Sequence, residues 1–293
     1  MQRTALCALK IGAFLKVGIG SIPVPIYRCA AADAQAVGRQ PSDTKPGSYG
    51  RWRWYNISRR RNPAVIAWGE LLPGGDLMYA IETLDIHGYQ TAPVPNAFFR
   101  QQQGTDHLAI VFPGIGYTAQ MPVLYYPTRL LLSRAADVLR VDYVYNRPEF
   151  QALSATEQDR WFQIDITAAY SAAKTQRHYT HVTLVGKSIG TLALGHLLAT
   201  TPLPPIRCVW LTPLLRNDQL RRQMCQIKQP ALLVIGTADP HYNATYLAEV
   251  EAATDGRSVI IEGADHSLEI DGKLVESIQA QARIIEALEQ FIT

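Results

Sequence analysis

Cysteine is scarce in this chain of 293 residues, which contains only four. They stand at Cys7, Cys29, Cys208 and Cys225. Their spacing fits neither a metal-ligand pattern nor a dense disulfide framework. We therefore expect reduced thiols and a cytoplasmic protein.

An apolar run long enough for a membrane-spanning helix is also missing. Residues 11–26 are fairly apolar, but Lys16 interrupts them, and Pro23 and Pro25 end them before the about 20 residues that a bilayer requires. A secretory signal is the alternative here, with basic residues before the run and the alanine-rich residues 30–34 near a cleavage site. Because the apolar centre is broken, we favour a cytoplasmic location and expect no membrane partner.

Charged residues are few, at 18%, and the net charge of +3 is unevenly distributed. Residues 1–77 contain 11 Lys and Arg against 4 Asp and Glu, a net charge of +7, whereas residues 78–293 contain 17 against 21, a net charge of −4. The basic character therefore says nothing about the ligand of the larger part. The overall hydrophobic content of 47% predicts a globular chain with one sizeable α/β core or two small ones.

Residues 38–63 are rich in Gly, Pro, Ser and Arg without a sustained period, which is typical of irregular chain. They include the segment 51–55, Arg-Trp-Arg-Trp-Tyr, which could bind nucleic acid or a membrane. No recognisable binding fold surrounds it, so we expect no nucleic-acid partner. We interpret residues 1–77 as a basic, irregular or non-native extension and residues 78–293 as the folded domain, with Met78 as the hypothetical natural start.

Apolar patterns alternate between strand and helix periods from Met78 onward. We expect strands at residues 79–86, 91–99, 107–112, 136–145, 182–185, 206–211, 231–235 and 257–261, and helices at 121–135, at 157–176, after 190 and at 274–291. The alternation predicts a mainly parallel sheet covered on both faces, with the first two strands as an antiparallel edge. Pro93 and Pro95 favour either an edge strand or an extended segment at residues 91–99. The glycine loop at 113–116 lacks the third glycine of a dinucleotide fingerprint, so a Rossmann fold is not favoured.

The stretch from His181 to Leu194 joins an apolar strand, a tight corner and a helix around the pattern Gly-x-Ser-x-Gly. Gly186 and Gly190 leave room for strand and helix to meet, and the corner holds Ser188 in strained backbone geometry. Such a serine projects toward a neighbouring base, beside free N–H groups at a helix N-terminus. The pattern alone also fits a small-residue turn between a strand and a helix, so the rest of the chain must decide.

Two later strands end in residues that would complete a nucleophilic site. Asp239 follows one strand and His266 follows the next, so both belong to the same sheet edge as Ser188. Asp239 by itself also fits a turn or helix cap before Pro240. Asp265, beside the histidine, is expected to cap its own loop.

With nucleophile, acid and base in this order, the chain resembles the α/β-hydrolase superfamily over roughly residues 78–293. Its Gly-Lys-Ser-Ile-Gly, Gly-Thr-Ala-Asp and Gly-Ala-Asp-His loops are most similar to small, nearly lidless, dienelactone-hydrolase-like members. The resemblance implies an α/β fold with a mainly parallel sheet and a minimal lid. It also implies that Ser188 is the nucleophile, His266 the base and Asp239 the acid that orients the base.

The resemblance further implies an oxyanion hole made by the backbone N–H groups of Ile115 and Ile189. Pro113 stands where many relatives carry histidine, which leaves Gly116 as an alternative second donor.

A serine hydrolase that cleaves a small ester or thioester through an acyl-enzyme is the function that the resemblance implies. A non-catalytic binding or scaffold protein and an acyltransferase stay open as alternatives. We expect a small acyl substrate near Tyr117, Leu214 and Tyr242, and neither a cofactor nor a metal ion. Lys187 is expected to border the mouth of the site, where a solvent-facing side chain is favoured over one that selects an anionic substrate.

Overall fold

The computed structural model describes residues 79–254 and 256–292. The predictions for residues 1–77, including the signal, the basic patch and the start at Met78, lie outside them. Within the described residues, no helix combines the length and the apolar composition that crossing a membrane requires.

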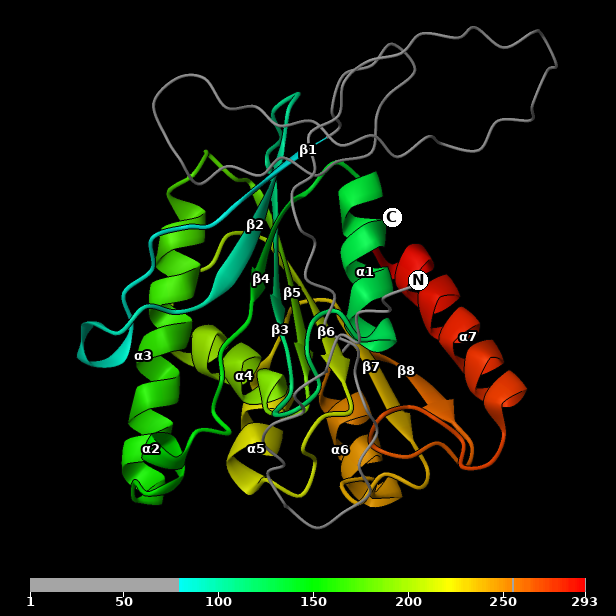
Figure 1. Ribbon diagram of the computed structural model, residues 1–293. Helices are drawn as coiled ribbons and strands as arrows, with labels where there is room; N and C mark the ends of the chain where they lie inside the picture. The colour runs from blue at the N-terminus through cyan, green and yellow to red at the C-terminus, as the bar shows by residue number, and fades with distance from the viewer. Residues whose placement is uncertain (1–78, 255, 293) are drawn as a thin grey trace, which may run out of the picture. The chain divides into compact units, whose positions relative to one another are not determined.

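An eight-stranded sheet forms the centre of the described part (Figure 1). Its strands are β1 (Tyr79–Glu82), β2 (Asn96–Gln101), β3 (His107–Phe112), β4 (Asp137–Val141), β5 (His181–Lys187), β6 (Ile206–Leu211), β7 (Ala231–Gly236) and β8 (Gly256–Ile261). They lie in the order β1-β2-β4-β3-β5-β6-β7-β8. β2 pairs antiparallel with β1 and β4, and all other pairs are parallel. The expected mainly parallel sheet with an antiparallel edge is confirmed.

Helices cover both faces of the sheet (Figure 1). One face carries α1 (Pro122–Ser133) and α7 (Leu274–Ile292). The other carries α3 (Ala155–Lys174), α4 (Gly190–Thr200), α5 (Asp218–Gln226) and α6 (Ala244–Ala253). Shorter pieces are the 3-10 turn η1 (Tyr89–Thr91) and α2 (Pro148–Gln151). Only the nine-residue α5 lies between β6 and β7, so this crossover has no room for a large lid, as expected.

The central strand β3 shows why this sequence forms such a sheet. Its run Leu-Ala-Ile-Val-Phe after His107 has no polar residue, because helices cover both faces of a central parallel strand. Leu108 and Ile110 enter the core on the α3 and α4 face, whereas Ala109 and Val111 enter the core on the α1 and α7 face. Full burial of each larger aliphatic side chain contributes about 1.5–3 kcal/mol.

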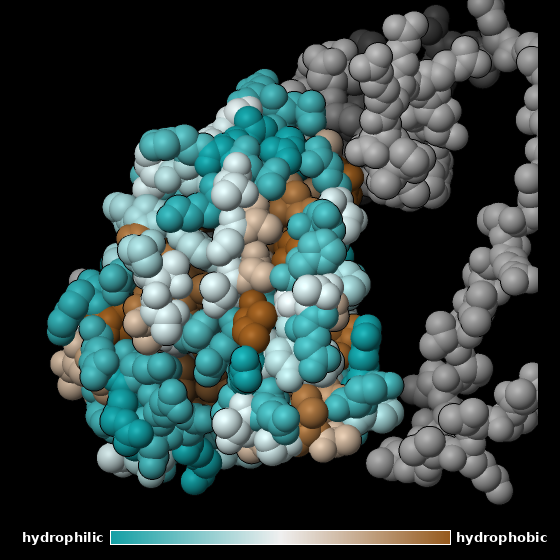
Figure 2. Space-filling view, turned by 90° about the vertical axis from the view of Figure 1, so that its left-hand side faces the viewer, coloured by the Kyte–Doolittle hydropathy of each residue, from teal (hydrophilic) through white to brown (hydrophobic). Residues whose placement is uncertain are grey.

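α3 is the outer layer of one face. Ser154 starts it with a capping box, in which the Ser154 hydroxyl accepts from the Glu157 N–H and the Glu157 carboxylate accepts from the Ser154 N–H. Phe162, Ile166 and Ala169 form its buried stripe. Figure 2 shows that the molecule is mainly hydrophilic on this side, with small, separate apolar areas. The helix therefore buries one stripe and exposes the rest to solvent.

The first predicted strand, at 79–86, is too long. β1 ends at Glu82, and the backbone of Leu84 instead bonds to the side-chain amide of Asn96. The Leu84 N–H donates to the Asn96 Oδ1 at 3.0 Å, and the Asn96 Nδ2 donates to the Leu84 carbonyl at 2.9 Å. A side chain thus takes the place of a partner strand.

Two other strand predictions differ in their bounds. The strand expected at 91–99 begins only at Asn96, after both prolines, and it lies between β1 and β4. Its expected edge position is therefore wrong, because β1 occupies the edge. The strand expected at 136–145 ends at Val141, and the residues that follow form a loop at the carboxyl edge of the sheet.

Candidate active site

The corner after β5 has the strained geometry that the sequence predicts. Ser188 adopts φ +55°, in the left-handed region that non-glycine residues rarely occupy, and α4 begins two residues later. A Cβ on Gly186 would collide with the Gly190 carbonyl, and a Cβ on Gly190 would collide with the Phe112 carbonyl. The two glycines are therefore required where the elbow touches α4 and the end of β3.

Three side chains meet above this corner. The Ser188 Oγ lies 2.8 Å from the His266 Nε2, and the His266 Nδ1 lies 2.7 Å from the Asp239 Oδ2. Both hydrogen bonds are satisfied together when Nδ1 carries the imidazole proton and Nε2 accepts from the serine. The structure thus brings together the serine, histidine and aspartate that the sequence singles out.

Asp239 serves both of the roles that its sequence context allowed. Its Oδ1 accepts from the His241 N–H at 2.8 Å, which is the turn interaction, while its Oδ2 faces His266. The carboxyl side chain is fully buried. The Ala238 N–H donates to the Ala264 carbonyl at 2.9 Å, so the acid loop is joined to the loop that carries the histidine.

The loop that carries His266 is closed by Asp265, the residue before the histidine. The Asp265 Oδ1 accepts from the backbone N–H groups of Ser267 and Glu269, at 2.7 and 3.1 Å. Asp265 therefore caps the loop, as the sequence predicts, and this leaves Asp239 as the acid that contacts His266.

Two backbone N–H groups beside Ser188 are available as donors. Among the described residues, no group accepts a hydrogen bond from the N–H of Ile115 or of Ile189. Ile189 is the N-cap of α4, where helix N–H groups carry partial positive charge. Ile115 lies in the loop after β3, in which the Gly114 N–H donates to the Tyr117 carbonyl at 3.2 Å. A Cβ on Gly114 would lie 3.2 Å from the Ser188 Cβ, so this loop runs close to the serine.

Comparison with known proteins agrees with this arrangement. A family model described as an alpha/beta hydrolase domain matches residues 106–293. The chain belongs to the alpha/beta hydrolase family. The family prediction, and with it the fold class, is therefore confirmed.

Solved structures add the same conclusion about the fold. The esterase Pf2001 of Pyrococcus furiosus is 13% identical, with a TM-score of 0.55 over 77% of this chain and 99% of that one. Est1E of Butyrivibrio proteoclasticus, with ferulic acid bound, is 14% identical, with a TM-score of 0.55 over 71% and 97%. XC6422 of Xanthomonas campestris, described as a serine hydrolase without lid, is 17% identical, with a TM-score of 0.51 over 75% and 97%. No curated protein matches the chain.

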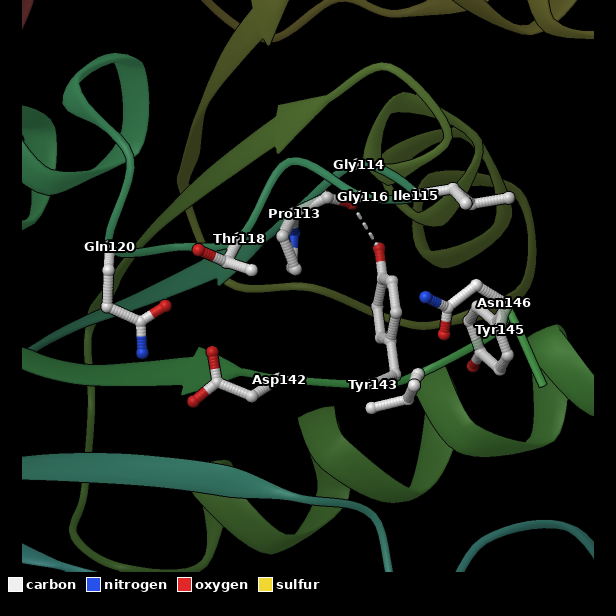
Figure 3. Close-up of a pocket in the computed structure, with 11 residues that line it drawn as sticks. Pro113, Gly114, Ile115, Gly116, Thr118, Gln120, Asp142, Tyr143, Tyr145 and Asn146 are labelled. Atoms are coloured by element: carbon white, nitrogen blue, oxygen red, sulfur yellow. Dashed lines mark hydrogen bonds between the residues drawn. The ribbon is translucent and has the colours of Figure 1, made fainter. Parts of the chain in front are cut away.

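This alpha/beta hydrolase has a pocket next to its first glycine loop (Figure 3). The pocket has a volume of about 260 Å³ and lies between residues 113–120 and residues 142–146. Figure 3 shows Tyr143 pointing from the second segment to the first, where its hydroxyl donates to the Pro113 carbonyl at 2.6 Å. The hydroxyl of Tyr145 donates to Asp165 of α3 at 2.9 Å. The sequence did not predict that residues 142–146 form one side of the pocket, because their pattern assigned both tyrosines to a strand.

The three residues expected to contact substrate pack against the cores on opposite faces of the sheet. Leu214 and Tyr242 are partly buried and pack against the same apolar cluster as Ile189. Tyr117 is instead buried in the opposite core, and its hydroxyl oxygen accepts from the Val123 N–H at 3.1 Å. Tyr117 therefore supports the glycine loop, whereas the sequence predicted that it contacts substrate.

Lys187 contradicts its prediction. The expected solvent-facing side chain is 1% exposed and lies beneath the loop of His266. Burial lowers the pKa of its ammonium group from 10.5 to about 8. The error has a physical reason, because a lysine at a strand end is usually exposed unless a distant segment covers it. Since the side chain is enclosed, it also does not border the mouth of the site.

In the part of the hydrolase that the structure describes, no three His, Cys, Asp or Glu side chains are arranged to hold a metal ion.

Proposed function

We propose that this protein is a serine hydrolase that cleaves a small ester or thioester. One observation carries the proposal: the hydrogen-bonded series from Ser188 through His266 to the buried Asp239, with 2.8 and 2.7 Å between the paired atoms. A serine hydroxyl becomes a nucleophile when a base takes its proton and a carboxylate stabilises the protonated base. The esterases among the solved structures support the proposal through the fold they share with this chain.

In the proposed first step, Ser188 Oγ attacks the acyl carbonyl carbon while His266 Nε2 takes the hydroxyl proton. Asp239 keeps the proton on Nδ1 and stabilises the imidazolium. The carbonyl oxygen becomes an oxyanion, which the N–H groups of Ile115 and Ile189 would bind. His266 then returns its proton to the leaving alcohol or thiol, and the acyl group stays on Ser188.

In the second step, His266 takes a proton from water, whose oxygen attacks the acyl carbon. The tetrahedral intermediate collapses, the carboxylic acid leaves and Ser188 regains its proton. The short segment between β6 and β7 leaves no large lid in this crossover, which favours a small substrate. We propose a small acyl compound as the partner; assignment to the dienelactone-hydrolase-like members stays a prediction.

Labelling of the full chain with a fluorophosphonate probe, beside hydrolysis of p-nitrophenyl acetate and butyrate, tests this function. We expect Ser188→Ala to lose the label and to lower kcat/KM by at least about 10³-fold. Ser267→Ala is the matched control, because Ser267 lies in the same loop as the base and, among the residues that the structure describes, only its backbone N–H makes a hydrogen bond there. A folded wild-type protein that neither labels nor hydrolyses these esters would refute the proposal and favour a binding role.

A further inference from the structure

A buried ammonium group lies next to the nucleophile and is not used in the chemistry above. The Lys187 Nζ donates to the backbone carbonyl of His266 at 2.8 Å and to the Thr212 Oγ1 at 3.3 Å. Enclosing an ammonium group is costly, and an apolar side chain of similar volume would fill the same space without that cost. The position of this charge therefore calls for a function.

The same ammonium group also contacts the glycine loop after β3. Its Nζ lies 4.3 Å from the centroid of the Tyr117 ring, within range of a cation–π interaction. The ring is held in place at both ends. Its hydroxyl oxygen accepts from the Val123 N–H at the start of α1, and the Tyr117 carbonyl accepts from the Gly114 N–H. One side chain thus joins the segments that follow β3, β6 and β8 at the carboxyl edge of the sheet.

These contacts bear directly on the base. The carbonyl that Lys187 holds belongs to His266 itself, and Lys187 is covalently joined to Ser188. The hydrogen bond therefore links the side chain of the residue before the nucleophile to the backbone of the base. Misplacement of a reacting group by about 1 Å can cost about 10²-fold in rate.

We propose that Lys187 is a positioning residue that holds the imidazole of His266 in line with the Ser188 hydroxyl while its side chain is protonated. This inference rests on the proposed function, because it concerns the same nucleophile and base. The neutral amine lacks the charge that strengthens the hydrogen bond and the contact with the Tyr117 ring, so its deprotonation loosens the alignment.

The charged groups around Lys187 determine the pH at which its ammonium group loses a proton. Burial favours the neutral amine, whereas Asp239, after β7, and Asp265, after β8, favour the ammonium; the result is a pKa of about 8. From the loop after β3, Tyr117 faces it as a neutral phenol, since burial raises the pKa of Tyr117 to about 12. Loss of the ammonium with a pKa of about 8 lowers kcat about tenfold by pH 9 if only the protonated form is aligned.

Stability changes in the opposite sense. The pKa of Lys187 is about 8 in the folded protein and 10.5 without burial, so the unfolded chain binds more protons between these values. Lys187 therefore makes the folded state more stable as the pH rises from about 8 to about 10.5. Unfolding linked to Lys187 therefore cannot be the cause of a fall in kcat over this range.

The test compares kcat and KM of the wild type, Lys187→Met and Lys187→Arg from pH 6.5 to pH 9.5. We expect Lys187→Met to lower kcat at pH 7 by about 10- to 100-fold with KM changed less than about threefold, and to show no alkaline fall. Lys187→Arg keeps its charge over this range, so we expect it to restore part of kcat without the fall near pH 8. Retention of kcat within twofold by Lys187→Met, or the same alkaline fall in that variant as in the wild type, overturns the inference.

Two further measurements keep the test decisive. If Lys187→Met does not fold, Thr212→Val removes one partner of the ammonium, and we expect the midpoint of the alkaline fall to move to lower pH; an unmoved midpoint contradicts the inference.

If the wild type neither labels nor hydrolyses esters, the proposed function fails first. The inference is then tested in the wild type, which keeps the Ser188 hydroxyl, by the proton resonance of the His266 Nδ1–H. We expect that resonance to be lost above about pH 8, and its persistence would overturn the positioning role.

Discussion

Strand β5 and the corner that follows it each carry a hydroxyl group, and each hydroxyl bonds to a histidine at the same distance. Near its start, the Thr183 Oγ1 lies 2.8 Å from the His107 Nε2; just after its end, the Ser188 Oγ lies 2.8 Å from the His266 Nε2. The pairs are similar in chemistry and separation. Their surroundings nevertheless differ in every respect that nucleophilic catalysis requires.

The first difference concerns the charge that each imidazole can accept. Asp239 lies 2.7 Å from the second ring nitrogen of His266, where its carboxylate can accept a hydrogen bond from the Nδ1–H. His107 is instead desolvated, with His181 and Arg207 as positive neighbours, and burial as the main cause lowers its pKa to about 4. His107 therefore resists the proton that a general base must accept.

The second difference concerns access. Thr183 is 1% exposed in a regular strand, between β3 and β6, so its hydroxyl cannot meet a substrate. Ser188 is lifted out of the strand by its positive φ, beside two N–H groups that can bind an oxyanion. A hydroxyl–imidazole hydrogen bond thus occurs twice on this strand path, and only the second pair has the corner and the acid on which the proposed function depends.

The largest expected effect comes from replacing each histidine. We expect His266→Gln to lower kcat/KM for p-nitrophenyl acetate by about 10⁴-fold, because the base is lost. His107→Gln can keep a hydrogen bond to Thr183, so we expect kcat/KM within about threefold of the wild type. Comparable losses in both folded variants would break the distinction between the pairs.

Removing the charge from the acid tests the first difference. We expect Asp239→Asn to lower kcat by about 10³-fold while the fold is retained, since the amide can donate to Nδ1 and favour the wrong tautomer. Circular dichroism controls for the fold, and steady-state kinetics give kcat. Activity near that of the wild type would mean that His266 does not depend on this carboxylate.

The pH dependence of the free energy of unfolding should report the burial of His107. Its folded pKa of about 4 lies below the ordinary value of 6.5, so the unfolded chain takes up the proton first as the pH falls. Its stabilising contribution is present above about pH 6.5 and is lost toward about pH 4. We expect the wild type to lose about 1–2 kcal/mol more than His107→Gln between pH 7.5 and pH 4.5, as measured by urea unfolding. Parallel curves would contradict the burial of this imidazole.

The smallest effect should report backbone strain at the elbow. Glycine occupies positive φ without strain, so we expect Ser188→Gly to have a free energy of unfolding about 1 kcal/mol higher than Ser188→Ala. At Thr183, in regular strand, alanine should be the more stable of the two replacements. Urea denaturation of the four variants gives both differences. The same order at both positions would refute strain at Ser188.

The sequence predicts the elbow, the acid and the base because each follows an apolar strand and carries a local pattern. Gly186, Ser188 and Gly190 adopt the expected corner, and Asp239 and His266 reach it from strands of the same sheet. Parallel strands bring their carboxyl ends to one edge, so the order of strands along the chain was sufficient.

Features that depend on distant covering segments could not be predicted. Whether Lys187 is buried depends on the loop of His266, 79 positions later in the chain. The strand predicted at 136–145 ends early because Tyr143 and Tyr145 bond to Pro113 and Asp165, which no local periodicity indicates. Local pattern thus identified the reacting groups, and only tertiary structure showed what positions them.

The order of these residues along the chain also determines when reactivity can arise during synthesis. Ser188 precedes His266 by 78 positions. A ribosome that adds about 5–20 residues per second therefore takes about 4–16 s between the two. During that interval the elbow can form a strand and a helix, but its hydroxyl has no base. Under the proposed function, the serine gains its base only when β7 and β8 join the sheet, and the growing chain is not acylated before then.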